Sequence, residues 1–88
     1  MKHWASARFW LLYEALPPEV RATADKNFQL LKSDSRHPSL HFKRIGKAWS
    51  VRVGARYRAP GLDVPGGIMW FWLGTHAEYD KIVGKKPV

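Results

Sequence analysis

The chain has 88 residues and a formal net charge of +8, because 15 Lys and Arg residues stand against 7 Asp and Glu residues. Its lack of cysteine excludes disulfide-stapled secreted scaffolds and thiolate zinc sites, and it favours a reducing, cytoplasmic location. The length allows a single domain, residues 1–88. The longest apolar run, 68–73, is too short to cross a bilayer, so no membrane partner is expected. The positive charge favours phosphate backbones or an acidic protein as partners.

Two amphipathic helices are predicted in the first third of the chain, separated by a pair of prolines. Residues 6–16 carry apolar side chains at helical spacing, and Ser6 is suited to cap the first turn. The two prolines end that helix, whereas Pro18 suits the first turn of the next one. The second helix should end before the turn-forming run that begins at Ser33. The two helices are expected to form an antiparallel hairpin.

Alternating apolar and polar residues then predict a sheet. The expected strands are 40–43, 49–53, 56–59 and 68–73, and the last is apolar on both faces, which is typical of a central strand. Residues 77–83 are expected to form a short C-terminal helix, followed by a frayed basic tail at 84–88. Because helices and strands are segregated along the chain, the predicted fold class is α+β. The helical hairpin should pack on one face of a small antiparallel sheet of three to four strands.

Three arginines of the second half form a candidate phosphate site. Alternation within 49–53 puts Arg52 on the open face, away from the helices. Arg56 and Arg58 fall on that same face if the following turn has an odd number of residues, and a two-residue turn would put Arg56 on the apolar face. We favour the odd turn because burying an unpaired guanidinium is costly. Such a cluster suits phosphate oxygens, and the alternative is a solvated face whose arginine stems cover tryptophan.

Histidines near these arginines would add proton-transfer groups. His41 shares a predicted strand face with Lys43, and His76 follows the glycine that ends the last strand. Tyr79 lies three residues after His76, so the two would share one face of a helical turn, where the tyrosine could stack on a base, donate a proton or fill the core. Two histidines beside clustered arginines suffice for metal-free RNA cleavage, in which a 2′-hydroxyl attacks the adjacent phosphorus. The alternative is that His41 and His76 have no functional role.

No metal or other cofactor is expected. The sequence has no cluster of carboxylates and no pair of histidines at the spacing that metal ions require. No glycine-rich phosphate loop precedes a helix, so hydrolysis of a nucleoside triphosphate has no support.

Four segments, taken in order, carry a family resemblance. They are Ala15-Leu16-Pro17 between the helices, His37-Pro38-Ser39-Leu40-His41-Phe42-Lys43, Trp49-Ser50-Val51-Arg52-Val53 leading to Tyr57-Arg58, and Trp70-Phe71-Trp72-Leu73-Gly74-Thr75-His76-Ala77-Glu78-Tyr79. This ordered set spans most of the chain and resembles the RelE/ParE superfamily of toxins from bacterial type II toxin–antitoxin systems. The resemblance implies a compact α+β toxin that a neighbouring antitoxin neutralises. Many members cleave messenger RNA in the ribosomal A site without a metal, and the ParE branch inhibits DNA gyrase.

The resemblance also implies roles for particular residues. Arg52 and Arg58 match strand positions where the nuclease branch keeps basic residues around the scissile phosphate. His76 matches a basic or histidine position after the last strand, and Tyr79 approximates the tyrosine that is common near the C-terminus. The candidate catalytic residues are therefore Arg52, Arg58, His76 and Tyr79, and the candidate RNA-binding residues are His41, Lys43, Arg44 and Arg56. The chain departs from the family in two places. Ser50 occupies a position that is often basic, and only residues 1–5 precede Ser6, so the strand that usually opens the fold is very short or missing.

The leading hypothesis is a ribosome-dependent endoribonuclease toxin that represses translation. Its expected partners are a cognate antitoxin, messenger RNA and the ribosome, and it should be a monomer when free of antitoxin. One alternative is a ParE-like toxin that inhibits DNA gyrase through its helices and C-terminal tail. The other is a basic nucleic-acid-binding module without catalysis, whose exposed tryptophans stack on bases.

Overall fold

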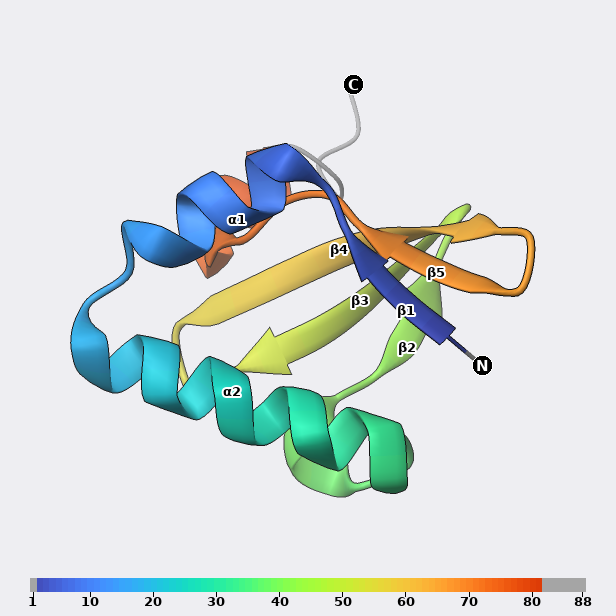
Figure 1. The fold of residues 1–88 in the computed structure, drawn as a ribbon, viewed down its shortest axis with the longest axis horizontal. Helices are drawn as coiled ribbons and strands as arrows, with labels where there is room; N and C mark the ends of the chain where they lie inside the picture. Colours follow the sequence, from blue (N-terminus) through green and yellow to red (C-terminus); the bar gives the residue numbers. More distant parts are fainter. Residues whose placement is uncertain (1, 82–88) are drawn as a thin grey trace.

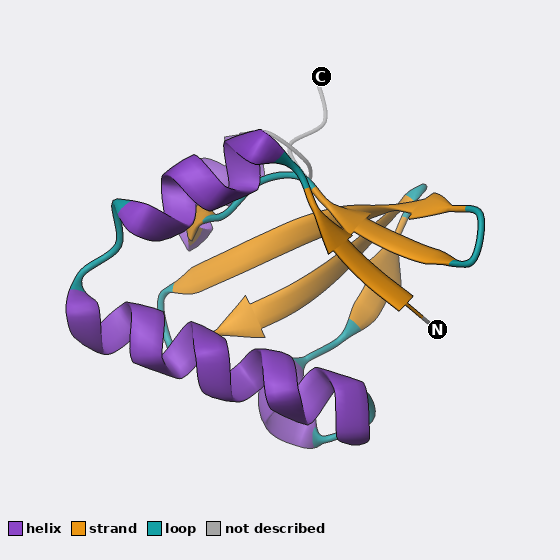
Figure 2. Cartoon of the chain, in the orientation of Figure 1, coloured by secondary structure: helices purple, strands orange, loops and turns teal. Residues whose placement is uncertain are grey.

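Two helices near the N-terminus lie across one face of a twisted sheet, and a short helix follows the last strand (Figure 1, Figure 2). The computed structural model describes residues 2–81. Its elements are β1 (Lys2–Ala5), α1 (Ala7–Glu14), α2 (Pro18–Ser33), the 3₁₀ helix η1 (Pro38–Leu40), β2 (Lys43–Ile45), β3 (Ala48–Val53), β4 (Tyr57–Val64), β5 (Gly67–Trp70), β6 (Gly74–Thr75) and α3 (His76–Tyr79). The predicted α+β class is confirmed. No helix within this part of the chain is long and apolar enough to cross a membrane.

The sheet is larger than the sequence predicted and is mixed rather than purely antiparallel. Its strand order is β1-β5-β4-β3-β2, and β6 also pairs with β4. All of these pairs are antiparallel except β1 with β5, which are parallel. The opening strand is therefore present but short. The prediction of a central strand at 68–73 was wrong, because the centre of the sheet is β4 and the strand β5 ends at Trp70.

A bulge separates β5 from β6. Ala59 and Pro60 of β4 lie opposite three residues, 71–73, because Gly61 pairs with Trp70 on one side and Arg58 pairs with Gly74 on the other. Pro60 has no N–H to donate, and its carbonyl accepts a hydrogen bond from the N–H of Phe71 at 3.2 Å. The extra residue interrupts the ladder and re-aims the chain. It brings the start of α3 to the beginning of β4.

The first two helices begin where the sequence predicts and are positioned by their caps. Ser6 caps α1, and its Oγ accepts a hydrogen bond from the N–H of Phe9 at 3.1 Å. The helix α1 ends at Glu14, two residues before the predicted end, and Pro18 opens α2. Leu16, between the helices, is buried in the core.

Two further predicted boundaries are wrong for local reasons. Residues 40–42 do not form a strand, because Pro38 opens a 3₁₀ turn, and His41 then adopts a left-handed backbone (φ 45°) before β2 begins at Lys43. The last helix begins at His76 rather than at residue 77, because Thr75 and Glu78 form a capping box. The predicted basic tail, 84–88, lies outside the described residues.

The hydrophobic core lies between the sheet and the two long helices. Its buried members come from every layer: Leu16, Leu31, Leu40, Val51, Val53, Ala59, Ile68, Trp70 and Leu73. Phe9, Leu12 and Val20 pack against this cluster from the helices and are only partly buried. Alternate residues of β3 and β4 thus enter the core, and their neighbours face the other side of the sheet.

Truncating the fully buried Leu40 tests this assignment of the core. We expect Leu40→Ala to lower the free energy of unfolding by about 2–5 kcal/mol, because it removes buried methyl groups and leaves a cavity. The matched control is Leu11→Ala, because Leu11 is 70% exposed on α1 and its loss should change stability by less than about 0.5 kcal/mol. Urea denaturation of both variants is the measurement, and equal losses would contradict the assignment.

Candidate functional site

Arg52 of β3 and Arg58 of β4 lie directly opposite each other in the sheet. The turn between these strands has three residues, 54–56, so the odd turn that we predicted is confirmed. Directly paired residues of antiparallel strands project from the same face. The two guanidinium groups therefore leave the sheet on the side away from the core.

Arg58 is buried rather than open to solvent, with 7% of its surface exposed. Its Nε and Nη2 both donate to the Oγ of Ser50, at 3.2 and 2.9 Å. Its guanidinium carbon lies 5.4 Å from the centre of the Tyr79 ring, which covers it from α3. The expectation that Arg58 lies on an open face was therefore wrong, because the bulge brings α3 over the beginning of β4.

Arg52 is half-buried and is held at the turn. Its Nε donates to the carbonyl of Gly54 at 3.0 Å, and its Nη1 lies 3.2 Å from Nε2 of His41. A guanidinium carries only donors, so His41 must accept in this pair, and the lone pair of its Nε2 is engaged. The left-handed backbone at His41 places this imidazole beside β3.

His76 and Tyr79 lie on the same side of α3, as their spacing predicted. Their ring centres are 6.2 Å apart, and His76 is exposed whereas Tyr79 is buried. The backbone N–H of His76 donates to the carbonyl of Arg56 at 2.8 Å, which ties the start of α3 to the β3–β4 turn. The hydroxyl of Tyr79 is buried and has no hydrogen-bond partner among the described residues.

The paired arginines have no carboxylate partner within residues 2–81. The ion pairs in this part of the chain are Arg44 with Asp63 at 2.7 Å and His76 with Asp80 at 3.7 Å, the second requiring a protonated imidazole. A buried cation without a counter-charge is costly, and an anion bound beside it would offset that cost. The arrangement is suited to holding a phosphate group.

Three predicted RNA-binding residues lie outside this cluster. Arg44 is in register with Trp49 on the other face of the sheet, where its guanidinium stacks on that indole and binds Asp63. Lys43 pairs with Ser50 and is exposed on the arginine face. The side chain of Arg56 is exposed in the turn.

Asp63 links Arg44 to Trp49 at the surface of the sheet. Its carboxylate accepts from Nε1 of Trp49 at 2.8 Å and from Nη2 of Arg44 at 2.7 Å. The hydrogen bond from Trp49, followed by that from Arg44, holds the pKa of this carboxyl below its ordinary value. Arg44 is thus engaged in a surface contact away from the paired arginines.

Ser50 is the residue at this site that the sequence analysis missed. We noted it only as a departure from a position that is often basic. Ser50 and Arg52 are two residues apart in β3, so strand alternation puts both on the same face. This was the one sequence feature that indicated Ser50 lies near the arginines. The contact with Arg58 depends on the cross-strand register, in which Ser50 pairs with Pro60, two residues beyond Arg58.

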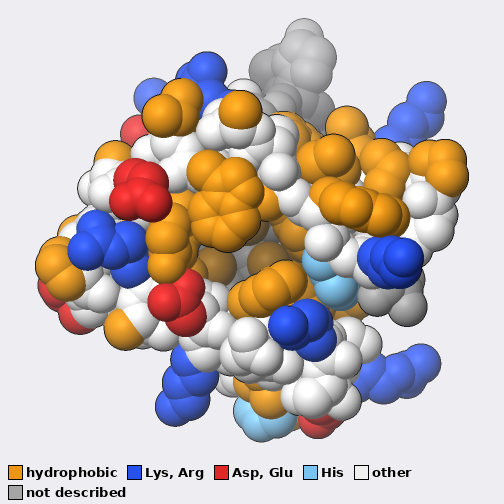
Figure 3. Space-filling view, viewed as in Figure 1, with side chains coloured by type: hydrophobic (Ala, Val, Ile, Leu, Met, Phe, Trp, Pro, Cys, Tyr) orange, Lys and Arg blue, Asp and Glu red, His pale blue; other side chains and the backbone are white. Residues whose placement is uncertain are grey.

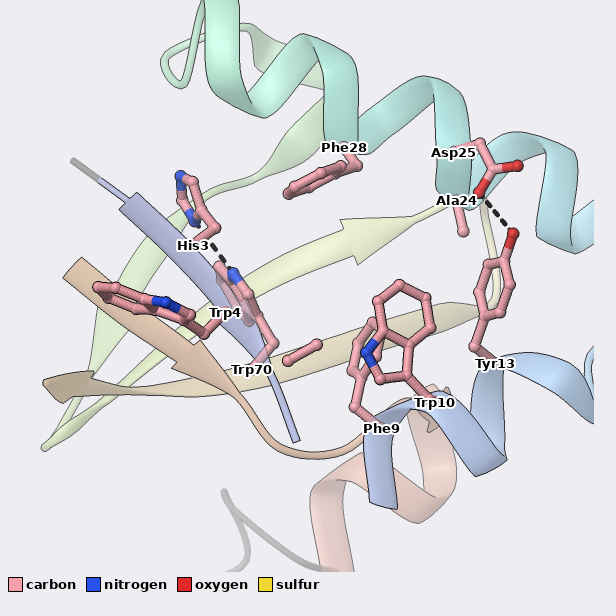
Figure 4. Close-up of a pocket in the computed structure, with 10 residues that line it drawn as sticks. His3, Trp4, Phe9, Trp10, Tyr13, Ala24, Asp25, Phe28 and Trp70 are labelled. Atoms are coloured by element: carbon pink, nitrogen blue, oxygen red, sulfur yellow. Dashed lines mark hydrogen bonds between the residues drawn. The ribbon is translucent and has the colours of Figure 1, made fainter. Parts of the chain in front are cut away.

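A second feature lies on the opposite face of the molecule, where aromatic side chains line a hollow between α1, α2 and β1 (Figure 3, Figure 4). Its volume is about 130 Å³, and its lining residues are His3, Trp4, Ala5, Phe9, Trp10, Tyr13, Ala24, Asp25, Phe28 and Trp70. Hydrogen bonds brace both ends: the Tyr13 hydroxyl donates to Asp25 at 2.6 Å, and Nε1 of Trp70 donates to Nδ1 of His3 at 3.1 Å. Burial, with the positive charge of Lys32 as a smaller cause, lowers the pKa of His3.

Comparison with solved structures identifies the fold. No family model and no curated protein match the sequence. A chain of the RelB–RelE antitoxin–toxin complex from Methanococcus jannaschii superposes with a TM-score of 0.68 at 15% identity, over 91% of this chain and 98% of that one. This chain has the RelE fold. The isolated RelE toxin from E. coli gives a TM-score of 0.61 at 10% identity, over 91% of this chain and 93% of that one.

The RelE fold confirms the architecture that the sequence resemblance implied. At these identities the likeness establishes the architecture, and the chemistry has to follow from this chain's own residues. No group of three or more His, Asp or Glu side chains that could hold a metal ion lies within residues 2–81. The paired arginines and the imidazole of His41 form a polar cluster on the side of the sheet away from α1 and α2.

Inorganic phosphate tests whether Arg58 is an anion site. At ten times its dissociation constant, phosphate should stabilise the protein by about 1.4 kcal/mol and raise the melting temperature by roughly 6–10 °C relative to chloride of equal ionic strength. We expect Arg58→Met to abolish this rise, because the uncompensated charge is gone, whereas Arg56→Met in the exposed turn should keep it. Calorimetry measures both, and a full phosphate response in Arg58→Met would exclude Arg58 as the site.

Proposed function

We propose that this chain is the toxin of a toxin–antitoxin system and acts as an endoribonuclease on messenger RNA at the ribosome, thereby repressing translation in the cytoplasm. The observation that supports it is the pair of guanidinium groups, one buried, with no carboxylate partner among the described residues and with the His41 imidazole bonded to Arg52. The RelE fold adds to this support, because one compared structure is described as a RelB–RelE antitoxin–toxin complex and the other as the isolated RelE toxin.

The proposed reaction is an attack of the 2′-oxygen of one nucleotide on the adjacent phosphorus. The bond from the 2′-oxygen to phosphorus forms, and the bond from phosphorus to the 5′-oxygen of the next nucleotide breaks. A base takes the 2′-hydroxyl proton, and an acid gives a proton to the departing 5′-oxygen. Negative charge grows on the phosphate oxygens in the transition state, and we assign its stabilisation to Arg52 and Arg58.

His76 is our candidate for proton transfer at this site. Its ring is exposed, and histidine is the side-chain type best suited to proton exchange near neutral pH. His41 is the candidate partner group, and its bond with Arg52 places it at the other end of the arginine pair. We propose that Tyr79 acts mainly through its ring face on Arg58, because its hydroxyl is buried.

A cleavage assay on ribosome-bound messenger RNA tests the proposal. Arg52→Ala and His76→Ala should each lower the rate about a hundredfold, because each removes a group that acts on the transition state. Arg44→Ala is the matched control and should cleave like the parent, since Arg44 binds Asp63 on the other face. A transcript with 2′-deoxyribose at the cleavage position should resist the parent protein, because the attacking oxygen is absent.

The results also separate the alternatives. Equal cleavage by His76→Ala, Arg52→Ala and the parent would overturn the site assignment. Inhibition of gyrase supercoiling without RNA cleavage would establish the ParE-like alternative. Steeply salt-dependent RNA binding without cleavage would establish the binding module.

A cognate antitoxin is the partner that we propose for the aromatic hollow. Three of the large apolar side chains that line it are exposed, Trp4 at 40%, Trp10 at 51% and Phe28 at 40%. Contiguous apolar surface of this kind is typical of a protein-binding site. The net charge of +8 favours an acidic partner, and the compared structure from Methanococcus jannaschii is an antitoxin–toxin complex. We therefore expect an acidic antitoxin that inserts apolar side chains here, and a toxin that is a monomer without it.

Trp10→Ala tests this docking surface. With the product of the neighbouring gene as the partner, we expect the variant to bind at least about 30-fold more weakly in titration calorimetry, because a central exposed tryptophan is a typical hot spot. Leu11→Ala is the control, since Leu11 is exposed on α1 and does not line the hollow. Unchanged affinity of Trp10→Ala would show that the antitoxin binds at another surface. If the parent protein does not bind the product of the neighbouring gene, the proposed antitoxin partner is overturned.

A further inference from the structure

Ser50 is a fully buried hydroxyl at the centre of the arginine face that the proposed reaction does not use. Its exposed fraction is 0%, and its Oγ lies within hydrogen-bond distance of both Nε and Nη2 of Arg58. A serine oxygen has two lone pairs, so it can accept both bonds. These bonds cross from β4 to β3 and fix the plane of the guanidinium relative to the sheet.

The two bonds occupy one particular edge of the guanidinium group. Arginine presents five N–H donors, and Nε with Nη2 forms its lateral edge, whereas Nη1 with the second hydrogen of Nη2 forms its terminal edge. Ser50 closes the lateral edge of Arg58. No bond to Nη1 is formed by the described residues, so the terminal edge is the one left for a phosphate.

The ring of Tyr79 restricts the Arg58 guanidinium by covering one of its faces. Its ring lies against the guanidinium, 5.4 Å from the guanidinium carbon, and it is itself 3% exposed. A buried aromatic face and a buried hydroxyl together leave Arg58 little freedom to turn. Arg52 lacks such a setting, because its bonds go to the turn carbonyl of Gly54 and to His41.

We propose that Ser50 is the positioning residue for Arg58, an inference that rests on the proposed function. By closing the lateral edge, it makes Arg58 present its terminal edge to the scissile phosphate. Ser50 itself does not touch the RNA. A lysine or arginine at this position would place a second cation against Arg58, whereas serine supplies a neutral acceptor.

A double-mutant cycle tests the effect on catalysis. Ser50→Ala should lower kcat for cleavage of ribosome-bound messenger RNA about tenfold to a hundredfold and change KM less than threefold, because a misoriented group costs transition-state binding. Ser50→Thr retains the hydroxyl and should recover most of kcat. In an Arg58→Lys background, Ser50→Ala should have no further effect, because lysine has no lateral edge to hold. Ser33→Ala, at an exposed serine of α2, is the matched control.

An NMR experiment tests the positioning without any cleavage. The Nε–H signal of Arg58 is assigned by its disappearance in Arg58→Lys, and its exchange with water should be slow in the parent. Ser50→Ala should accelerate this exchange at least tenfold and leave the Nε–H of Arg52 unchanged, because only the bond to Ser50 is lost. Unchanged exchange in Ser50→Ala would show that Ser50 does not hold Arg58.

The two experiments separate this inference from the proposed function. If the parent protein cleaves no RNA, the proposed function fails, while the exchange of the Arg58 Nε–H still decides whether Ser50 positions that group. If exchange accelerates but kcat does not fall, Ser50 anchors Arg58 without directing the reaction, and the inference is overturned. An equal effect of Ser50→Ala in the parent and in Arg58→Lys would also overturn it, because the serine would then act on something other than Arg58.

Discussion

A buried guanidinium held by neutral groups is the interaction on which this site depends. Arg58 is bonded by the hydroxyl of Ser50 and covered by the ring of Tyr79, and neither contact neutralises its charge. Most buried arginines are paired with carboxylates, which neutralise the positive charge inside the protein. Here the charge stays available to a ligand. This unpaired charge makes the ligand-free protein less stable than it would be with an apolar side chain at position 58, which is a common compromise at functional sites.

The sheet separates two surfaces with different chemistry. The residues of β3 that alternate with Ser50 and Arg52, such as Val51 and Val53, enter the core beneath the two long helices. The aromatic hollow lies on that helical side, and the arginine pair lies on the other. A partner bound in the hollow would therefore leave the arginine pair uncovered unless the partner also wraps around the edge of the sheet. Inhibition by such a partner would require either that extension or a steric block at the ribosome.

Local pattern determined much of the architecture, and contacts distant in sequence determined the rest. The helices followed from Ser6 and the two prolines, and the shared face of Arg52 and Arg58 followed from alternation and the cost of burying a charge. The burial of Arg58 under Tyr79 could not be predicted from the sequence, because it depends on one extra residue in the bulge. The alternation of residues along a strand does not specify how strands pair on the far side of a bulge. The parallel pairing of β1 with β5 joins segments more than 60 residues apart, and no local signal specifies it.

The bulge has a consequence for how such chains can diverge. Residues 71–73 oppose only two residues of β4, so their number, more than their identity, decides where α3 begins. A deletion of one residue there would restore a regular ladder and turn the following side chains to the opposite face of the sheet. The segment should thus tolerate many substitutions and reject insertions and deletions. Among distant relatives, a constant spacing between Trp70 and His76 would be a better marker of a working site than similarity of the residues between them.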